Sequence, residues 1–211
     1  VNRSGMLEDL QNLPSGSIVV LHACCHNPTG VDLSPEDWKN VLDVLKAKGH
    51  VPFLDMAYQG FGDGIEEDAA AVRLFAESGL TFFASSSFSK SFSLYGERVG
   101  ALSIVTESKD ETARVLSQVK RVIRTNYSNP PTHGATIVAA VLNNPELREM
   151  WEQELGEMRL RIRGMRKAMV EKLAAQTDHD FSFVGRQRGM FSYSGLTTEQ
   201  VHRLRNEFGI Y

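Results

Sequence analysis

Residues 17–55 read SIVVLHACCHNPTGVDLSPEDWKNVLDVLKAKGHVPFLD and establish the fold class. The stretch opens and closes with apolar runs, Ser17 to His22 and Val51 to Asp55, which are typical of buried strands. A helix is expected between them, because Ser34-Pro35 is a favourable helix start and Gly49 a favourable helix end. A strand, a helix and a strand in this order predict two parallel strands joined by a crossover helix.

The same alternation continues beyond this stretch. Strand patterns recur at Leu80 to Ser85 and at Val99 to Val105, and a helical pattern covers Asp68 to Glu77. We therefore expect an α/β fold, with a mostly parallel sheet and helices on both of its faces. Sheets of this kind bind ligands at the carboxyl ends of their strands, so the loops after the strands are the place to look for chemistry.

The last third of the chain has a helical pattern. Helices are expected over Asp110 to Arg124, over Thr132 to Leu142 and from Pro145 to about Gln176. The third of these carries a cluster of cations, Arg159, Arg161, Arg163, Arg166 and Lys167. Because glutamates lie among them, we interpret the cluster as a solvated charged face and not as a nucleic-acid site.

A smaller α+β unit is expected at the end of the chain. It begins with a strand-like run at Met190 to Tyr193 and a helix at Thr198 to Phe208. We accordingly assign residues 1–157 to a large domain that lacks its N-terminal part, and residues 158–211 to the start of a small, truncated domain. The chain does not open with methionine and stops soon after a helix, so we expect an internal segment of a longer protein.

Composition excludes several classes of protein. The 211 residues are 42% hydrophobic and 23% charged, which is typical of a globular protein and excludes wholesale disorder. A formal net charge of -3 argues against a general polyanion binder, and no apolar stretch approaches the roughly 18 residues of a spanning helix. Cys24 and Cys25 make no disulfide framework. We expect a cytoplasmic protein with neither a nucleic acid nor a membrane as its partner.

Two of the loops that follow predicted strands contain polar side chains suited to a binding site. The first, His26-Asn27-Pro28-Thr29-Gly30, is either a simple turn or a stiffened loop that presents the Asn27 amide to a ligand. The second begins with Asp55, whose carboxylate at the end of an apolar run needs a cation or strong donors. Tyr58, three residues on, reaches the same space; a simple cap by Asp55 is the alternative.

The loop after the third predicted strand contains one lysine among small hydroxyl residues and aromatics. Lys90 has no acidic residue within four positions. An amine in such surroundings can have a lowered pKa and form a Schiff base with a carbonyl compound. The hydroxyls of this run are natural phosphate ligands, and Arg98, eight residues beyond the lysine, suits bidentate phosphate recognition.

Together these groups match what pyridoxal phosphate requires of a protein. An acid holds the ring nitrogen protonated, an amide and a phenol contact the ring hydroxyl, and a lysine holds the aldehyde. A hydroxyl and a guanidinium bind the phosphate. The sequence therefore predicts a pyridoxal 5'-phosphate site.

The motifs also resemble those of the class I aminotransferases, within them the aspartate and aromatic amino acid branch. The resemblance rests on His26-Asn27-Pro28-Thr29-Gly30, Asp55-Met56-Ala57-Tyr58-Gln59-Gly60-Phe61, Ser87-Phe88-Ser89-Lys90 and Leu94-Tyr95-Gly96-Glu97-Arg98-Val99-Gly100. Several motifs in the same order, over nearly the whole chain, make it specific. It implies the large domain of the fold type I transferases that depend on pyridoxal phosphate.

The resemblance implies a role for each cofactor-binding residue. Lys90 would carry the cofactor and later act as the base that moves a proton. Asp55 would pair with the ring nitrogen. The remaining contacts would be Asn27 and Tyr58 at the ring hydroxyl, and Ser87 and Arg98 at the phosphate.

Three further residues are implied in substrate binding. Arg124 matches an arginine that reaches the site of a neighbouring subunit and grips the side-chain carboxylate of a substrate, and Asn129 would help to position that substrate. Phe191 matches a position of the substrate pocket. The resemblance thus implies a homodimer with shared active sites. It also implies an arginine beyond Tyr211 for the α-carboxylate and an aromatic residue before Val1 that stacks on the cofactor.

The activity that follows is transfer of an amino group between aspartate or an aromatic amino acid and 2-oxoglutarate, in amino acid metabolism. Alternatives are a truncated domain that binds the cofactor without catalysis, and a related β-lyase or decarboxylase. A zinc site at His22, Cys24, Cys25 and His26 is disfavoured, because four ligands within five residues do not converge on one tetrahedral ion. We expect no metal.

Overall fold

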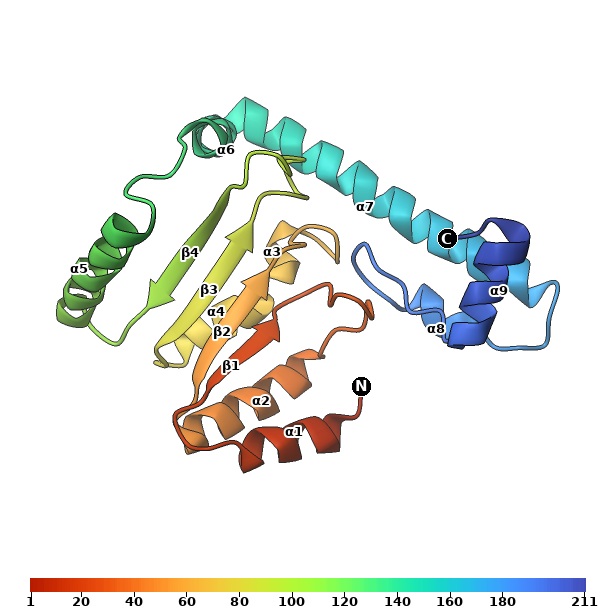
Figure 1. Cartoon of the computed structure of the whole chain (residues 1–211), viewed down its shortest axis with the longest axis horizontal. Coiled ribbons are helices and arrows are strands. Elements are labelled where there is room, and N and C mark those ends of the chain that lie inside the picture. The colour runs from red at the N-terminus through yellow and green to blue at the C-terminus, as the bar shows by residue number, and fades with distance from the viewer.

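The computed structural model describes all of residues 1–211, which form a four-stranded sheet and nine helices (Figure 1). The strands β1 (Ile18–His22), β2 (Val51–Met56), β3 (Phe82–Ser87) and β4 (Gly100–Val105) lie side by side in that order. The first three run parallel, and β4 runs antiparallel to β3. The expected mostly parallel sheet is therefore confirmed.

The helices follow the predicted pattern with three additions. They are α1 (Arg3–Asn12), α2 (Pro35–Lys48), α3 (Ile65–Asp68), α4 (Ala70–Glu77), α5 (Lys109–Asn126), α6 (His133–Asn143), α7 (Pro145–Ala174), α8 (Ser182–Gly185) and α9 (Thr198–Phe208). The sequence did not predict α1, α3 or α8. None of the helices combines the length and the apolar character that a membrane crossing requires.

One face of the sheet is covered by α2 and α4, which lie behind it in Figure 1. Side chains of the two helices, Trp38, Val41, Leu45 and Phe75, join those of the strands, Val19, Leu54 and Phe82, in one hydrophobic core. Since Val41, Leu45 and Phe75 are fully buried, each contributes roughly 1.5–3 kcal/mol of transfer free energy. This core fixes the position of the strands, and so of the loops that follow them.

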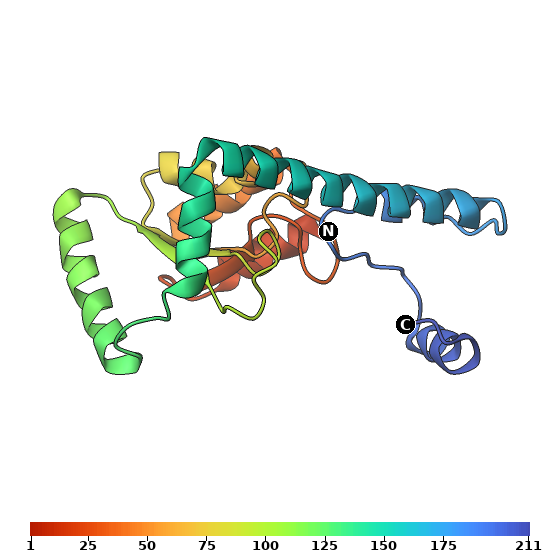
Figure 2. The ribbon, with the colours of Figure 1, turned by 90° about the horizontal axis from the view of Figure 1, so that it is seen from above.

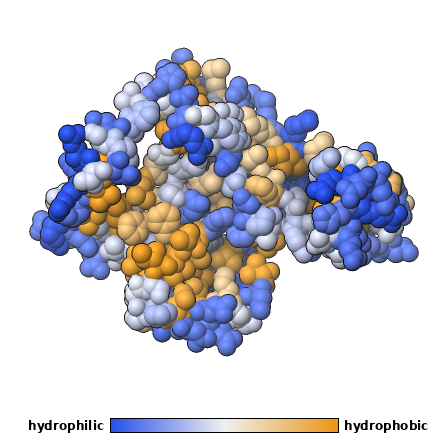
Figure 3. Space-filling view, viewed as in Figure 1, coloured by the Kyte–Doolittle hydropathy of each residue, from blue (hydrophilic) through white to orange (hydrophobic).

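The opposite face of the sheet is open within residues 1–211. Ile18 and Val20 on β1 are 68% and 64% exposed, and Leu102 on β4 is 55% exposed. Hydrophobic residues gather on the face that Figure 1 presents (Figure 3). The expectation of helices on both faces is therefore met on one face only. The side chains of His22 and Asp55 alternate with the buried positions of their strands and lie on this open face.

The long helix α7 crosses the chain beside the loop that follows β3 and extends past the sheet (Figure 2). The indole N–H of Trp151 donates to the Ser91 carbonyl over 2.6 Å, and the Trp151 ring stacks on Phe92 with 4.5 Å between ring centroids. α7 runs unbroken through residues 157 and 158, where the sequence analysis divided the chain. One unbroken helix therefore connects the sheet region to the last 37 residues, 175–211.

The strand predicted at Met190 to Tyr193 is wrong, because these residues form no strand. Their backbone groups are bound by side chains instead of by a neighbouring strand. Gln187 donates from Nε2 to the Tyr193 carbonyl over 2.9 Å and accepts from the Tyr193 N–H over 3.0 Å. The carbonyl of Phe191 accepts from Arg166. An alternating pattern forms a strand only where a neighbouring strand is available to pair with it.

The start of α2 generates a stability prediction. Ser34 Oγ accepts from the Asp37 N–H over 3.1 Å, while the Ser34 hydroxyl and backbone N–H both donate to Asp37 Oδ2, over 2.7 Å and 3.0 Å. These bonds, the hydroxyl first, hold the pKa of Asp37 below its ordinary value. We expect Ser34→Ala to lower the free energy of unfolding by about 1 kcal/mol at pH 7.

The effect is also expected to depend on pH. A carboxylate with a depressed pKa stabilises the fold above its unfolded pKa, about 3.9, and loses that contribution as pH falls through the folded value. The difference between Ser34→Ala and the unaltered protein should therefore shrink below pH of about 4. Urea unfolding at pH 7 and in acid measures it, and equal differences at both would contradict the assignment.

Candidate functional site

The carboxyl ends of β1, β2 and β3 bring three polar residues into one row on the open face. His22 pairs with Asp55 in the strand register, and Asp55 pairs with Ser85. The Ser85 hydroxyl donates to Asp55 Oδ1 over 2.7 Å. The strong donor that a half-buried Asp55 needs is therefore supplied by the next strand. Oδ2 of Asp55 accepts no hydrogen bond from the chain.

The loop after β1 and the loop after β2 meet at Tyr58. The Asn27 side-chain amide donates to the Tyr58 hydroxyl over 3.3 Å, and the Asn27 backbone N–H donates to His22 Nδ1 over 3.2 Å. Tyr58 is buried, so its phenol is held by packing as well as by this bond. The amide and the phenol that the sequence singled out therefore lie together.

Lys90 joins this group from the loop after β3. Its Nζ lies 4.8 Å from the centroid of the Tyr58 ring, a cation–π contact. The side chain is half-buried and takes part in none of the ion pairs of the chain. The amine is thus directed to the Tyr58 phenol and is not neutralised by a carboxylate.

Asp32 is a contributor that the sequence analysis missed. Its Oδ2 and Oδ1 accept from the backbone N–H groups of Cys25 and His26, both over 2.8 Å, and so fix the loop that carries Asn27. Burial, and then the nearby His22 ring, lower the pKa of His26 below its ordinary value. Asp32 could have been found from the sequence, because it is an acid five residues beyond Asn27, at the far end of the same loop.

Ser87 and Arg98 lie on adjacent segments at the edge of this group. Ser87 ends β3 opposite Gly100, and the Phe88 N–H donates to the Val99 carbonyl over 3.3 Å. Arg98 is exposed and donates to the Tyr95 carbonyl over 2.9 Å. The hydroxyl of Ser87 accepts from the Ser89 N–H, which leaves its own proton available to a ligand.

Arg124 and Asn129 are not brought into this group. Both are exposed, at the end of α5 and in the turn after it. Arg124 donates to the Ser128 hydroxyl, and the Asn129 N–H donates to the Tyr127 carbonyl. Their contacts stay within their own turn, so any role in binding requires a ligand that approaches from outside this cluster.

Phe191, far along the chain, does reach the group. Its ring meets the Tyr58 ring edge-to-face, with centroids 5.4 Å apart and planes at 88°. Its loop also interlocks with the loop of Asn27, because the Arg188 N–H donates to the Gly30 carbonyl over 2.7 Å. A Cβ added at Gly30 would lie 2.5 Å from the Phe191 carbonyl oxygen, so the two backbones touch.

The cations of α7 are a second feature that the sequence analysis misinterpreted. Arg161 and Lys167 are exposed as expected, but Arg159 and Arg163 donate to the carbonyls of Gly60 and Gly62, both over 2.7 Å. Arg166 is only 6% exposed, so the interpretation of a solvated face is wrong for it. Residues 159, 163 and 166 are spaced by four and three and so share one face of the helix. This spacing could have predicted that the three arginines contact the rest of the chain together.

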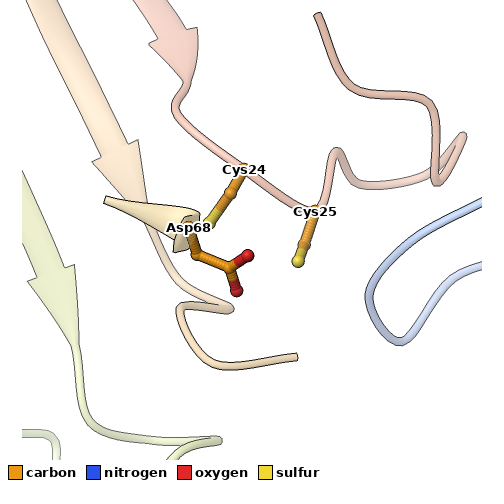
Figure 4. A group of neighbouring side chains, drawn as sticks. All are labelled: Cys24, Cys25 and Asp68. Carbon is orange, nitrogen blue, oxygen red and sulfur yellow. The ribbon is translucent and has the colours of Figure 1, made fainter. Parts of the chain in front are cut away.

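Cys24, Cys25 and Asp68 form a buried cluster in which potential ligand atoms lie within 4.8 Å of one another (Figure 4). The Asp68 carboxylate already accepts three backbone N–H groups, from Gly60, Gly62 and Asp63, over 2.8–2.9 Å. A hydrogen bond with Cys25, and then burial, raise the pKa of the Cys24 thiol far above its ordinary value. A protonated thiol and an occupied carboxylate favour a packing role over metal binding.

Comparisons with known proteins identify the family to which the chain is similar. The family model for aminotransferase class I and II matches residues 1–211. An aspartate aminotransferase of Pseudomonas aeruginosa is 82% identical over the whole chain, and an aromatic-amino-acid aminotransferase of Escherichia coli is 52% identical over the same span. The chain spans about half the length of these curated relatives, 53% of each.

Solved structures give the same result. The aromatic-amino-acid aminotransferase of Burkholderia pseudomallei, a structure covalently bound to pyridoxal phosphate, is 71% identical and superposes with a TM-score of 0.98. The alignment covers 100% of this chain and 53% of that one. A mitochondrial aspartate aminotransferase of Trypanosoma brucei is 46% identical with a TM-score of 0.96 over 100% of this chain and 56% of its own. The resemblance drawn from the sequence motifs is confirmed.

The interlocked loops generate a prediction with a matched control. Gly189 and Gly16 both have φ of 78°, but a Cβ at Gly189 would lie 2.5 Å from Cys25 Cβ, whereas nothing lies within 4 Å at Gly16. We expect Gly16→Ala to cost about 1–2 kcal/mol for the left-handed backbone. Gly189→Ala should cost about 1–3 kcal/mol more, because Cys25 must move. Urea unfolding of the two variants measures the difference, and equal costs would contradict the close approach.

Proposed function

The chain belongs to the class I and II aminotransferase family, and from this membership we propose that its parent protein is an aminotransferase dependent on pyridoxal phosphate. The proposed reaction moves an amino group between aspartate or an aromatic amino acid and 2-oxoglutarate. The observation that carries the proposal is the position of Lys90, with its amine 4.8 Å from the Tyr58 ring, beside the strand end where Asp55 emerges.

The residues at the strand ends fit the cofactor. Bound pyridoxal phosphate supplies an aldehyde that condenses with amines and a pyridinium ring that accepts electrons. Asp55 has one carboxylate oxygen fixed by Ser85 and the other without a donor in the chain, so Oδ2 is suited to hold a proton on the ring nitrogen. The Tyr58 hydroxyl and the Asn27 amide are suited to bind the ring hydroxyl, and Ser87 and Arg98 the phosphate.

Lys90 has two proposed functions. With pyridoxal phosphate bound, Nζ would hold its aldehyde, and the amine, once free, would serve as the base that moves the substrate proton. A lysine that performs this work has to be free of other partners. The contact with the Tyr58 ring holds Nζ in place, and no carboxylate forms an ion pair with it.

Arg124 and Asn129 are proposed to bind the side-chain carboxylate of a substrate in the site of a second subunit. Their exposure, with contacts only inside their own turn, supports a role away from their own cluster. We accordingly propose a homodimer with shared sites. We further propose a cytoplasmic protein of amino acid metabolism, whose large domain includes residues 1–157 and whose small domain begins near residue 158.

The first test removes the amine. In the full-length protein, Lys90→Ala is expected to abolish the visible-edge absorption band that added pyridoxal phosphate gives with the unaltered protein. It should also lower transamination of aspartate and phenylalanine at least about 10³-fold. Lys39→Ala, at an exposed lysine without side-chain bonds, is the control. An unaltered protein that forms no such band, or that yields elimination products or CO₂ in place of 2-oxo acids, would contradict the proposed reaction.

The second test concerns the substrate carboxylate. Arg124→Ala should weaken aspartate binding about 10–100-fold, the worth of a hydrogen bond between charged groups, and affect phenylalanine far less. Single-turnover half-reactions with each amino acid measure this without interference from 2-oxoglutarate. Arg121→Ala, an exposed arginine one turn earlier on α5, is the matched control. Equal losses for both amino acids would remove Arg124 from the carboxylate site.

A further inference from the structure

We infer that Arg166 is a positioning residue of the substrate pocket: it fixes residues 187–192 and, through Phe191, the contact between the pocket wall and Tyr58. The inference rests on the proposed function, because the pocket is that of the proposed aminotransferase. It assigns a task to the one cation of α7 that is buried and takes part in no ion pair.

The side chain of Arg166 is engaged on every nitrogen. Nε donates to the Ser192 hydroxyl over 2.8 Å and Nη1 to the Gln187 carbonyl over 3.1 Å. Nη2 donates to the carbonyls of Gly189 and Phe191, over 2.5 Å and 2.7 Å. A planar guanidinium with a fixed fork of donors can serve four acceptors that converge from one loop, and a lysine ammonium cannot.

The charge of Arg166 is not balanced by any carboxylate. Burial therefore lowers the pKa of this guanidinium, and the neighbouring Arg163 lowers it further. A buried cation without an acid is costly unless its hydrogen bonds are complete. Since four neutral acceptors of residues 187–192 supply those bonds, the conformation of this loop and the burial of Arg166 depend on each other.

From the loop, contacts lead directly to the reactive amine. Phe191 meets the Tyr58 ring edge-to-face at 5.4 Å, and the Tyr58 ring lies 4.8 Å from Lys90 Nζ. Gly189 of the same loop lies against Cys25, because a Cβ added at Gly189 would lie 2.5 Å from Cys25 Cβ. The loop is thus held between the Arg166 guanidinium and the loop that carries Asn27.

Arg159 and Arg163 hold a different loop and so provide a comparison within one helix. They donate to the carbonyls of Gly60 and Gly62, and Arg163 also pairs with Asp63. Arg188, next to Gly189, pairs with the same Asp63 over 2.6 Å. Only Arg166 binds residues 187–192 through their backbone carbonyls, so its loss should act on the Phe191 wall specifically.

The test is a double-mutant cycle in the full-length protein loaded with pyridoxal phosphate. We expect Arg166→Lys to raise KM for phenylalanine about tenfold and to change kcat less than about threefold, since a displaced apolar wall weakens side-chain binding. In the background of Phe191→Ala the same change should have almost no further effect on KM. Arg161→Lys, at the exposed arginine of the same helix, should leave both constants unchanged.

Two outcomes would overturn the inference. A tenfold rise in KM that persists in the Phe191→Ala background would show that Arg166 does not act through Phe191. A lower melting temperature with unchanged KM for phenylalanine would show a purely structural role. Arg166→Lys keeps the charge and the stem; if it does not fold, Ser192→Ala, which removes only the acceptor of Nε, replaces it in the same cycle.

A measurement that needs no activity separates this inference from the proposed function. Hydrogen–deuterium exchange of Arg166→Lys should show faster exchange of the amides of residues 187–193 than of residues 60–63, which other arginines hold. If the variant shows this faster exchange while the unaltered full-length protein has no transaminase activity, the loop assignment stands and the proposed function is refuted. Unchanged exchange at 187–193 would refute the loop assignment itself.

Discussion

The parallel pairing of β1, β2 and β3 is the constraint on which the candidate site depends. Parallel strands end at the same edge of a sheet, so the loops that carry Asn27, Tyr58 and Lys90 have to meet there. The core of α2 and α4 behind the sheet holds the strands in register. Asp55 and Ser85 are neighbours across two strands for the same reason, and their 2.7 Å hydrogen bond follows from the register and not from either loop.

Much of this site could be predicted from the sequence because its residues follow strands. Asp55, Tyr58 and Lys90 come at or just after the ends of strands, so the strand pattern and a parallel sheet were enough to place them at one edge. Phe191 and Arg166 could not be placed in this way, since no strand leads to either of them, and the alternation at Met190 to Tyr193 suggested a strand that does not form. Their positions result from hydrogen bonds between one helix and one loop, which local patterns do not record.

The helix α7 explains why distant parts of the chain act on one site. Its arginines tie the loop of residues 60–63 and the loop of residues 187–192 to a single rigid element, and Trp151 ties the loop after β3 to the same helix. Three loops are therefore hydrogen-bonded to one helix, so a shift of α7 would move all three of them. A helix whose sequence suggests only a charged surface can thus hold distant loops in place.

The charges of the site are arranged so that they do not neutralise one another. Lys90 and Asp55 emerge from neighbouring strands but form no ion pair, because Lys90 Nζ lies beside the Tyr58 ring and Asp55 is held by Ser85. A direct pair would occupy both the amine and the carboxylate, and neither group would then be free to contact a ligand. A ligand with a carbonyl carbon at one end and a basic ring nitrogen at the other satisfies both groups at once. The acid and the amine, each without a charged partner, therefore fit the chemistry of the proposed cofactor.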